Sequence, residues 1–309
     1  MSFDPELRAR QFQTLPVETL KGLYLRSDAQ GALRIGFHLL AIALGSAIVW
    51  ATSGTVWMVP AMLLQGLFLV SLFAPMHECV HQTAFASRWA NDLCAFLAGG
   101  ALLYVASYYR QFHVLHHRHT QDPAHDPELL QAPYPRHRAE FWLRVSALPF
   151  WLLRLSQLAG FAIGRFDGLA FLGRKGHAEI IRSTWLLLAL LAAAVALSLW
   201  LGSAAIIWYW LLPLLLAMPF LRLYLMCEHG GCAQSADAFV NTRTTHTIWP
   251  VRLLMWNMPF HAEHHLYPNI PFHALPSAHE RLQAHMKIVS EGYLATLRQL
   301  YAAYSARPA

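Results

Sequence analysis

The sequence predicts an all-α integral membrane protein, and two observations carry that prediction. Of the 309 residues, 56% are hydrophobic and only 13% are charged, which is about half the charged fraction of an ordinary soluble domain. Two long stretches, residues 35–76 and 183–221, contain no Asp, Glu, Lys or Arg. One bilayer crossing takes about 20 apolar residues, so each stretch is long enough for two crossings.

Each apolar stretch is interrupted near its middle by small, turn-forming residues, at 51–55 and at 202–203. We therefore predict two transmembrane hairpins, over residues 35–76 and 183–226, with four membrane helices in all. A hairpin returns the chain to the side of the membrane from which it started. The segments before, between and after the hairpins should therefore share one side.

Basic residues lie between the two predicted hairpins and are missing from both predicted outer turns. Because Lys and Arg in short loops favour the cytoplasmic side, we expect both termini and residues 77–182 to face the cytoplasm. The chain is then a multi-pass protein of the inner (cytoplasmic) membrane. The net charge of +6 should meet anionic lipid head groups, and we expect no nucleic-acid partner.

The hairpins and their flanking segments should form a single domain over residues 1–309. Residues 1–34 are expected to be a partly helical cytosolic lead-in. Its start carries acidic residues and precedes no apolar run, so we expect no cleavable signal peptide. The first two membrane helices should cover about 35–50 and 56–76.

Three further pieces are predicted between the hairpins. Residues 93–109 are apolar, short for a crossing and broken by the Gly99-Gly100 pair, so we expect a re-entrant or interfacial helix. Residues 120–136 are rich in Pro and Asp and should form a loop. Residues 139–165 mix Arg with Trp, Phe and Leu, which is typical of a helix in the membrane surface.

The cytosolic tail, residues 227–309, should contain a Pro-rich loop followed by an amphipathic helix. The apolar residues at helical spacing in that helix are Ile288, Tyr293, Leu297, Leu300 and Tyr304. Together with the segment between the hairpins, the tail is expected to form a helical cytosolic cap.

Histidine is unusually frequent, with eighteen residues, and half of them occur in four places beside the predicted membrane helices. The motif HECVH directly follows the second helix, HVLHH follows the short apolar segment, and HAEHH lies in the tail. Residues three or four apart share one face of a helix, so each motif can direct two or three imidazoles to one point. The nine histidines are His77, His81, His113, His116, His117, His229, His261, His264 and His265.

Each motif taken alone has an ordinary interpretation. An HxxxH pair is common by chance, and HVLHH followed by Arg118 and His119 could bind lipid head groups. The placement of all these motifs at one membrane face favours metal binding. Imidazoles crowded together there would otherwise repel one another as cations or lack hydrogen-bond partners. Nine ligands exceed the four of a zinc site, so we predict two adjacent metal ions.

Acidic and amide side chains lie close in sequence to these histidines. We expect them to accept the second ring N–H of a metal-binding histidine and so to fix its tautomer. For any one of them, an exposed loop charge or a helix cap is the alternative. The candidates are Glu78, Asp122, Asp126, Glu228, Asn257 and Glu263.

HECVH, HVLHH and NMPFHAEHHLYPNIP resemble the three histidine boxes of the membrane fatty acid desaturase and hydroxylase superfamily, notably of its bacterial fatty acid desaturases. The resemblance covers roughly residues 30–285, with the boxes and hairpins in the family's order. Glu228-His229 is similar to the isolated Glu-His of the sphingolipid-desaturase branch. The resemblance implies a non-haem di-iron centre that uses dioxygen on an unactivated C–H position, with all nine histidines as iron ligands.

The chain departs from the family pattern in two respects. In acyl-CoA desaturases an Asn stands four residues before the lone histidine and reaches the metal through water, whereas this position is Leu225 here. Asn257 is a candidate for a related role. The sequence also has no haem, nicotinamide or flavin signature. A separate electron donor is therefore implied, ferredoxin-like or cytochrome-type with its reductase, attracted by the basic surface.

The leading hypothesis is an oxygen-dependent desaturase that introduces a double bond into a fatty-acyl or lipid substrate. A hydroxylase or ketolase of a lipid, carotenoid, alkane or small amphiphilic metabolite would use the same site. A zinc-dependent membrane hydrolase is a more distant alternative, because it would need only a few of these histidines. A metal transporter is equally distant, since it would place ligands within the membrane helices rather than after them.

Overall fold

The computed structural model describes residues 11–305, which are helical apart from connecting segments and one pair of two-residue strands. Four helices are long and apolar enough to cross a membrane, and two bent helix pairs pass the same test together. The predicted all-α membrane fold with several crossings is confirmed. The first ten residues of the predicted lead-in and residues 306–309 of the tail lie outside the described residues.

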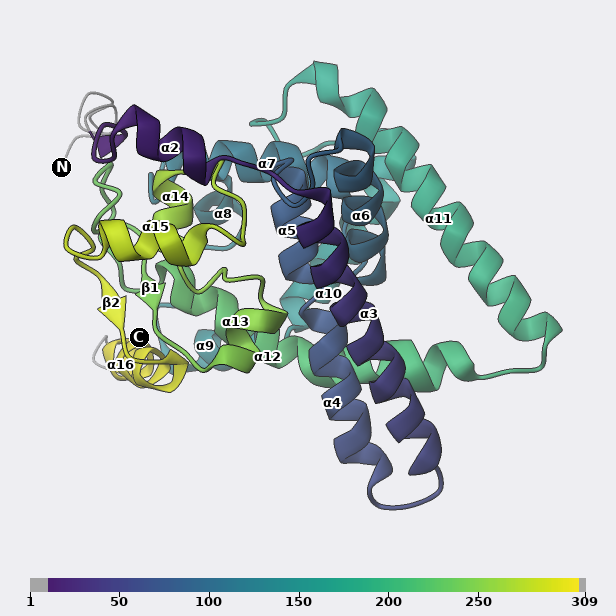
Figure 1. The fold of residues 1–309 in the computed structure, drawn as a ribbon. Helices are drawn as coiled ribbons and strands as arrows, with labels where there is room; N and C mark the ends of the chain where they lie inside the picture. Colours follow the sequence, from purple (N-terminus) through teal and green to yellow (C-terminus); the bar gives the residue numbers. More distant parts are fainter. Residues whose placement is uncertain (1–10, 306–309) are drawn as a thin grey trace.

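The first predicted hairpin is formed by α3 (Asp28–Ala51) and α4 (Met58–Val70), which lie side by side and are joined at the lower end of Figure 1. α3 begins at Asp28, earlier than apolarity alone predicted, because the Ser27 side chain accepts a hydrogen bond from the Gln30 amide and caps the helix. After a short break the chain continues as α5 (Phe73–Val80), which carries the first histidine motif.

Between the hairpins, α6 (Arg88–Ala101) and α7 (Ala106–His119) meet at an angle of 101°, the geometry of a re-entrant pair or of a broken span. The bend lies at residues 102–105, so the prediction of a break at the Gly99-Gly100 pair was wrong. These glycines stay helical and permit close packing: a Cβ at the first of them would lie 3.1 Å from the sulfur of Met76.

The predicted loop contains one short helix, α8 (Pro127–Gln131). The predicted membrane-surface helix consists of two, α9 (Arg138–Val145) and α10 (Leu148–Ala162), which are bent by 55°. The bend follows from Ala147, which has a φ of 59° and therefore cannot continue a right-handed helix.

The second predicted hairpin consists of α11 (His177–Trp200) and α12 (Leu212–His229), which is preceded by a π-helical turn, η2 (Ile207–Leu211). The two helices diverge: α12 packs mainly against α4, whereas α11 packs against α10 and α7 and runs along the outer side of the molecule in Figure 1. α12 also extends beyond the predicted end near Met226. His229 therefore lies in the last turn of the helix rather than after it.

The tail and the lead-in pack together into a cap, on the left in Figure 1. The strands β1 (Thr244–Thr245) and β2 (Val289–Ser290) pair in parallel within it. Ile288 was predicted to belong to the final helix, but it precedes β2 and its carbonyl accepts a hydrogen bond from the Thr244 amide. The helices of the cap are α2 (Val17–Leu23), α13 (Trp249–Leu254), α14 (His261–Leu266), α15 (Leu275–Leu282) and α16 (Tyr293–Ser305).

The largest core cluster joins the membrane helices to the cap. It contains Met76 of α5, Met218 of α12 and Trp256 of the tail, and each of these side chains is essentially inaccessible to solvent. Met76 directly precedes His77, Trp256 shortly precedes His261, and Met218 lies on the helix that ends at His229. The same packing therefore holds these histidines in place.

Candidate metal centre

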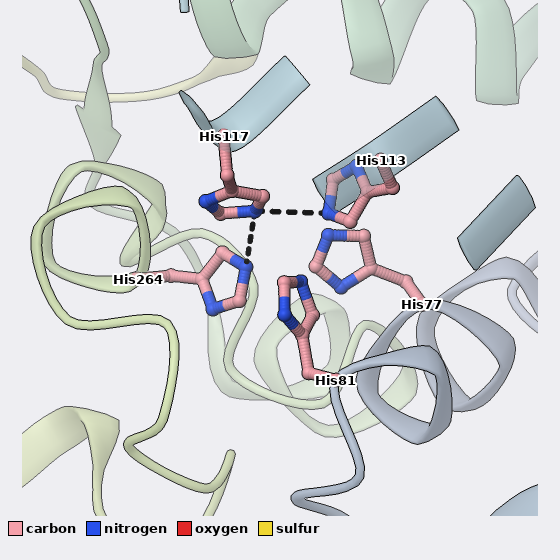
Figure 2. A group of neighbouring side chains, drawn as sticks. All are labelled: His77, His81, His113, His117 and His264. Atoms are coloured by element: carbon pink, nitrogen blue, oxygen red, sulfur yellow. Dashed lines mark hydrogen bonds between the residues drawn. The ribbon is translucent and has the colours of Figure 1, made fainter. Parts of the chain in front are cut away.

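The structure brings the four histidine-bearing segments to one place, where eight of the nine predicted ligands form two adjacent groups. The five-histidine group contains His77, His81, His113, His117 and His264, whose rings point toward one another in Figure 2. The three-histidine group contains His116, His229 and His265. Within each group, one nitrogen from every ring lies within 4.8 Å of the others, so each group could hold a metal ion.

Helix geometry explains how the motifs divide between the groups. In α7, His113 and His117 stand one turn apart on the same face and both join the five-histidine group. His116 is offset by about 100° around the helix axis from its neighbour and joins the other group. α14 repeats the arrangement, with His264 in the first group and His265 in the second.

The ring nitrogens converge in the five-histidine group. His117 Nε2 lies 3.0 Å from His113 Nε2 and 3.2 Å from His264 Nε2 (Figure 2). The rings of His77 and His113 have centroids 4.2 Å apart. These nitrogens come from three separate helices, so tertiary packing creates the convergence.

A stacked ring pair connects the two groups, because His117 and His265 lie with centroids 4.0 Å apart and planes at 14°. In the second group, His229 Nε2 lies 3.2 Å from His116 Nε2. His261 belongs to neither group, yet its Nε2 lies 3.2 Å from His229 Nε2. The ninth predicted ligand is therefore at the edge of the three-histidine group.

Several of these rings have buried nitrogens that no hydrogen bond satisfies, as expected of ligands that bind a metal ion. Both nitrogens of His77, Nε2 of His81 and of His265, and Nδ1 of His264 are buried without a hydrogen-bond partner among the described residues. A buried polar atom without a partner typically costs about 1–3 kcal/mol. A metal ion that accepts the lone pair of a neutral imidazole would remove that cost.

Burial keeps the imidazoles neutral. Desolvation lowers the pKa of His81 to about 3. It also lowers the pKa values of His261, His264 and His265 far below the ordinary value, and neighbouring imidazoles lower them further. Neutral imidazole is the form that binds metal, so the site is already in its binding form at neutral pH.

The predicted contact between the Asp126 carboxylate and a histidine ring is present. Asp126 Oδ1 lies 2.9 Å from His116 Nδ1, and Asp126 Oδ2 accepts a hydrogen bond from the Gln121 amide. With Nδ1 of His116 as the donor, Nε2 keeps its lone pair on the side of His229. Glu228 lies at a longer distance, with Oε1 3.7 Å from His261 Nδ1.

Sequence reasoning missed Glu128. Its Oε2 lies 3.5 Å from His116 Nε2, the nitrogen that faces His229. The sequence signal that could have identified it is its position two residues after Asp126. Asp126 caps α8, and its side chain accepts a hydrogen bond from the Glu128 amide, so Glu128 stays close to the histidines. Glu128 could add a carboxylate ligand to the three-histidine group.

The structure corrects the roles predicted for Glu78 and Glu263. Glu78 accepts hydrogen bonds from the Thr83 hydroxyl and the Phe272 amide. Glu263 contacts the Thr244 hydroxyl and His279 Nδ1, each at 2.5 Å. Each carboxylate is next to a predicted ligand histidine in sequence, and neighbouring residues of a helix point to different faces. The two carboxylates therefore connect the histidine motifs to the cap instead of to the imidazoles.

The predictions for Asn257 and Asp122 are corrected in the same way. The Asn257 amide donates to the Phe272 carbonyl at 2.9 Å and braces the tail. Asp122 accepts a hydrogen bond from the exposed His125 ring at 2.8 Å. Neither contact orients one of the nine histidines.

A cavity of about 540 Å³ opens beside both groups, and His77, His113, His116 and His261 form part of its wall. Aromatic side chains form much of the remaining wall. Leu225, which stands where acyl-CoA desaturases carry Asn, also lines it. The cavity has the size and largely apolar lining of a site for an organic molecule.

The family model for fatty acid desaturases matches residues 54–295, which is most of the chain. The chain belongs to the fatty acid desaturase family. It is 26% identical to an sn-1 oleoyl-lipid 12-desaturase of Synechocystis sp. over 301 residues, with 88% of this chain and 80% of the relative covered. Proteins of the same name from Picosynechococcus sp. and Anabaena variabilis are 22% and 24% identical, with 90% and 91% of this chain and 83% of each relative covered.

Membership in the desaturase family confirms the resemblance found in the sequence. It identifies the chain as an oxidoreductase that uses dioxygen, and it favours that function over a hydrolase or a transporter. The two histidine groups of this desaturase lie beside that cavity, so a metal ion held by either group would adjoin the space for an organic molecule.

Proposed function

We propose that the chain is a di-iron, dioxygen-dependent desaturase that introduces a double bond into the fatty-acyl chain of a membrane lipid. The observation that carries the proposal is the position of two histidine groups on the wall of one aromatic cavity, within a membrane protein of the desaturase family. The names of the three relatives, all oleoyl-lipid desaturases, support a lipid substrate.

The nine histidines would hold the two irons. The five-histidine group would bind one ion, and the three-histidine group would bind the other, with His261 and Glu128 at its edge. Iron bound here would supply the oxidising chemistry together with dioxygen. Asp126 would hold His116 in the tautomer that presents its lone pair to the metal.

The rest of the cavity wall would position the substrate and exclude water. Phe73, Tyr104, Tyr109 and Phe112 line the cavity beside the histidines and suit an apolar chain. A chain held against them would place a C–H bond near the metals while keeping bulk water away from the reaction.

We also propose the single domain over residues 1–309, with the cap and both termini on the cytoplasmic side of the inner membrane. Lys and Arg residues between the hairpins support that orientation. Electrons would come from a separate ferredoxin-like or cytochrome-type donor that approaches the same basic side.

Metal analysis of the purified protein, combined with lipid mass spectrometry of cells with and without the gene, tests the proposal. We expect about two irons per chain and lipids that have lost two hydrogens. His264→Ala should abolish the product, whereas His137→Ala, at a half-buried residue outside both groups, should not. A gain of one oxygen atom would identify a hydroxylase instead, and a single zinc with unchanged lipids would overturn the proposal.

A further inference from the structure

The cavity beside the histidine groups has a basic side that the desaturation chemistry does not use. Four arginines line it: Arg136, which is exposed, and Arg144, Arg154 and Arg222, which are not. Arg144 is satisfied within the protein, because its guanidinium donates to the carbonyls of Ala132 and Pro133. Arg154 and Arg222 differ from it in their contacts.

Arg154, on α10, is a buried cation without an anionic partner. Only 8% of the residue is exposed. Its guanidinium carbon lies 4.2 Å from the centroid of the Tyr104 ring and 5.5 Å from that of Phe150. Among the described residues it makes no hydrogen bond or ion pair, and its Nε is buried and unpaired. Aromatic faces attract the charge but leave the N–H donors unsatisfied.

Arg222, on α12, lies beside the same aromatic ring as Arg154. Its guanidinium carbon also lies 5.5 Å from the centroid of Phe150, and its Nε is likewise buried without a partner in the described part of the chain. Two guanidinium groups on one aromatic ring repel each other, since like charges in a poorly hydrated site are weakly screened. Glu128, one of three glutamates on the cavity wall, lies beside His116 and attracts Arg222 electrostatically, but it forms no ion pair with Arg222 among the described residues.

Aromatic rings connect this basic side with the five-histidine group. Arg154 stacks on Tyr104, the Tyr104 and Tyr109 centroids are 5.4 Å apart, and Tyr109 stacks on His113 at 5.2 Å with planes at 11°. A molecule that lies along these rings could therefore reach both the arginines and the histidine groups.

We propose that Arg154 and Arg222 bind the oxyanion of the substrate, so that the cavity selects amphiphiles with a carboxylate or a phosphate over uncharged ones. A planar guanidinium donates two parallel N–H bonds to such an oxyanion, and one anion between two cations removes their mutual repulsion. The inference rests on the proposed function only in identifying the bound molecule as the substrate.

Binding to the purified, metal-loaded protein in neutral detergent tests the inference. The probes are oleate for a carboxylate, dioleoyl phosphatidate for a phosphate, and methyl oleate and dioleoylglycerol as their uncharged counterparts. We expect the wild-type protein to bind one or both anionic probes more tightly than their uncharged counterparts. The probe that it prefers identifies the oxyanion as a carboxylate or a phosphate. Arg154→Gln with Arg222→Gln should weaken anionic binding about 10- to 100-fold, the usual loss for charge-assisted hydrogen bonds, and leave uncharged binding unchanged.

Arg165→Gln is the matched control, because Arg165 is exposed and paired with Asp167, and it should bind like wild type. The single variant Arg222→Gln keeps the test decisive if the double variant does not fold, since that side chain is less buried than Arg154. Equal binding of anionic and uncharged probes by wild type, or unchanged preference in a folded variant, overturns the inference.

Activity separates this inference from the proposed function. His264→Ala should lose turnover but keep the preference for the anionic probe. A wild-type protein that binds anionic probes selectively but oxidises no lipid would contradict the proposed desaturase function alone. A wild-type protein that desaturates lipids without any preference for an oxyanion would contradict the arginine site alone.

Discussion

The two histidine groups share α7 and α14, whereas α5 contributes only to the five-histidine group and α12 only to the three-histidine group, and their surroundings also differ. In the five-histidine group, the adjacent carboxylates Glu78 and Glu263 bond to residues of the cap rather than to the rings. The three-histidine group has acidic contacts, with Asp126 on His116 and Glu128 near the same ring. Carboxylate contacts raise the basicity of an imidazole and offset metal charge, so the two metal positions should not be equivalent.

Removing one ligand from each group should produce the largest effects. We expect His81→Ala and His229→Ala each to lower desaturation at least about 100-fold, because a lost ligand disrupts a metal position outright. Metal content should fall toward one ion per chain, with the loss at a different position in each variant. Elemental analysis and product quantification measure both effects, and His137→Ala serves as the control. Full activity in either ligand variant would exclude its group from the reaction.

Asp126→Asn should weaken the three-histidine group selectively. Losing the carboxylate that orients His116 should lower metal affinity there about 10- to 100-fold and leave the five-histidine group loaded. Competition with a chelator, followed by metal analysis, measures the difference. Asp122→Asn is the matched control, because Asp122 contacts the exposed His125 instead. Equal losses at both groups would refute the difference between them.

The metal-free protein should lose stability as the pH falls. His81 has a pKa of about 3 when folded, while an unfolded histidine titrates near 6.5. Between these values the unfolded chain binds a proton that the folded chain does not, so acidification favours unfolding. Each such histidine contributes about 1.4 kcal/mol per pH unit, and the loss proceeds from pH 6.5 down to 3.

Thermal unfolding of the metal-free protein at pH 7.5 and 5.5 measures this effect, and His81→Gln should reduce it. Bound metal should oppose the loss until protons displace it, because binding to the folded state alone stabilises that state. A melting temperature that does not change between the two pH values would contradict the burial of neutral imidazoles.

Glu263→Gln should have the smallest effect on the metals. Glu263 contacts Thr244 and His279, so its loss should lower the melting temperature modestly through a weakened hydrogen-bond network. Metal content should stay at the wild-type level, in contrast to Asp126→Asn. Metal loss equal to that of Asp126→Asn would show that Glu263 acts on the ligands after all.

Local sequence patterns predicted much of this site but left its details open. Spacing within HVLHH predicted that His113 and His117 share a helix face, and the structure agrees. The same spacing could not show that Glu263 points to His279 or that Glu128 lies beside His116. Those directions depend on how α8, α14 and α15 pack, and packing partners are not encoded in the spacing of one segment.

The sequence by itself determined that this is a helical membrane protein whose histidine motifs follow the membrane helices. Uninterrupted apolar runs and three- or four-residue spacings are local properties that need no knowledge of neighbours. Only the tertiary structure decided that α11 and α12 diverge, that the imidazoles divide into two groups, and that Arg154 and Arg222 meet at one ring. A membrane helix that is apolar on every side carries little signal about which helix it will contact, so these arrangements arise only when the whole chain packs.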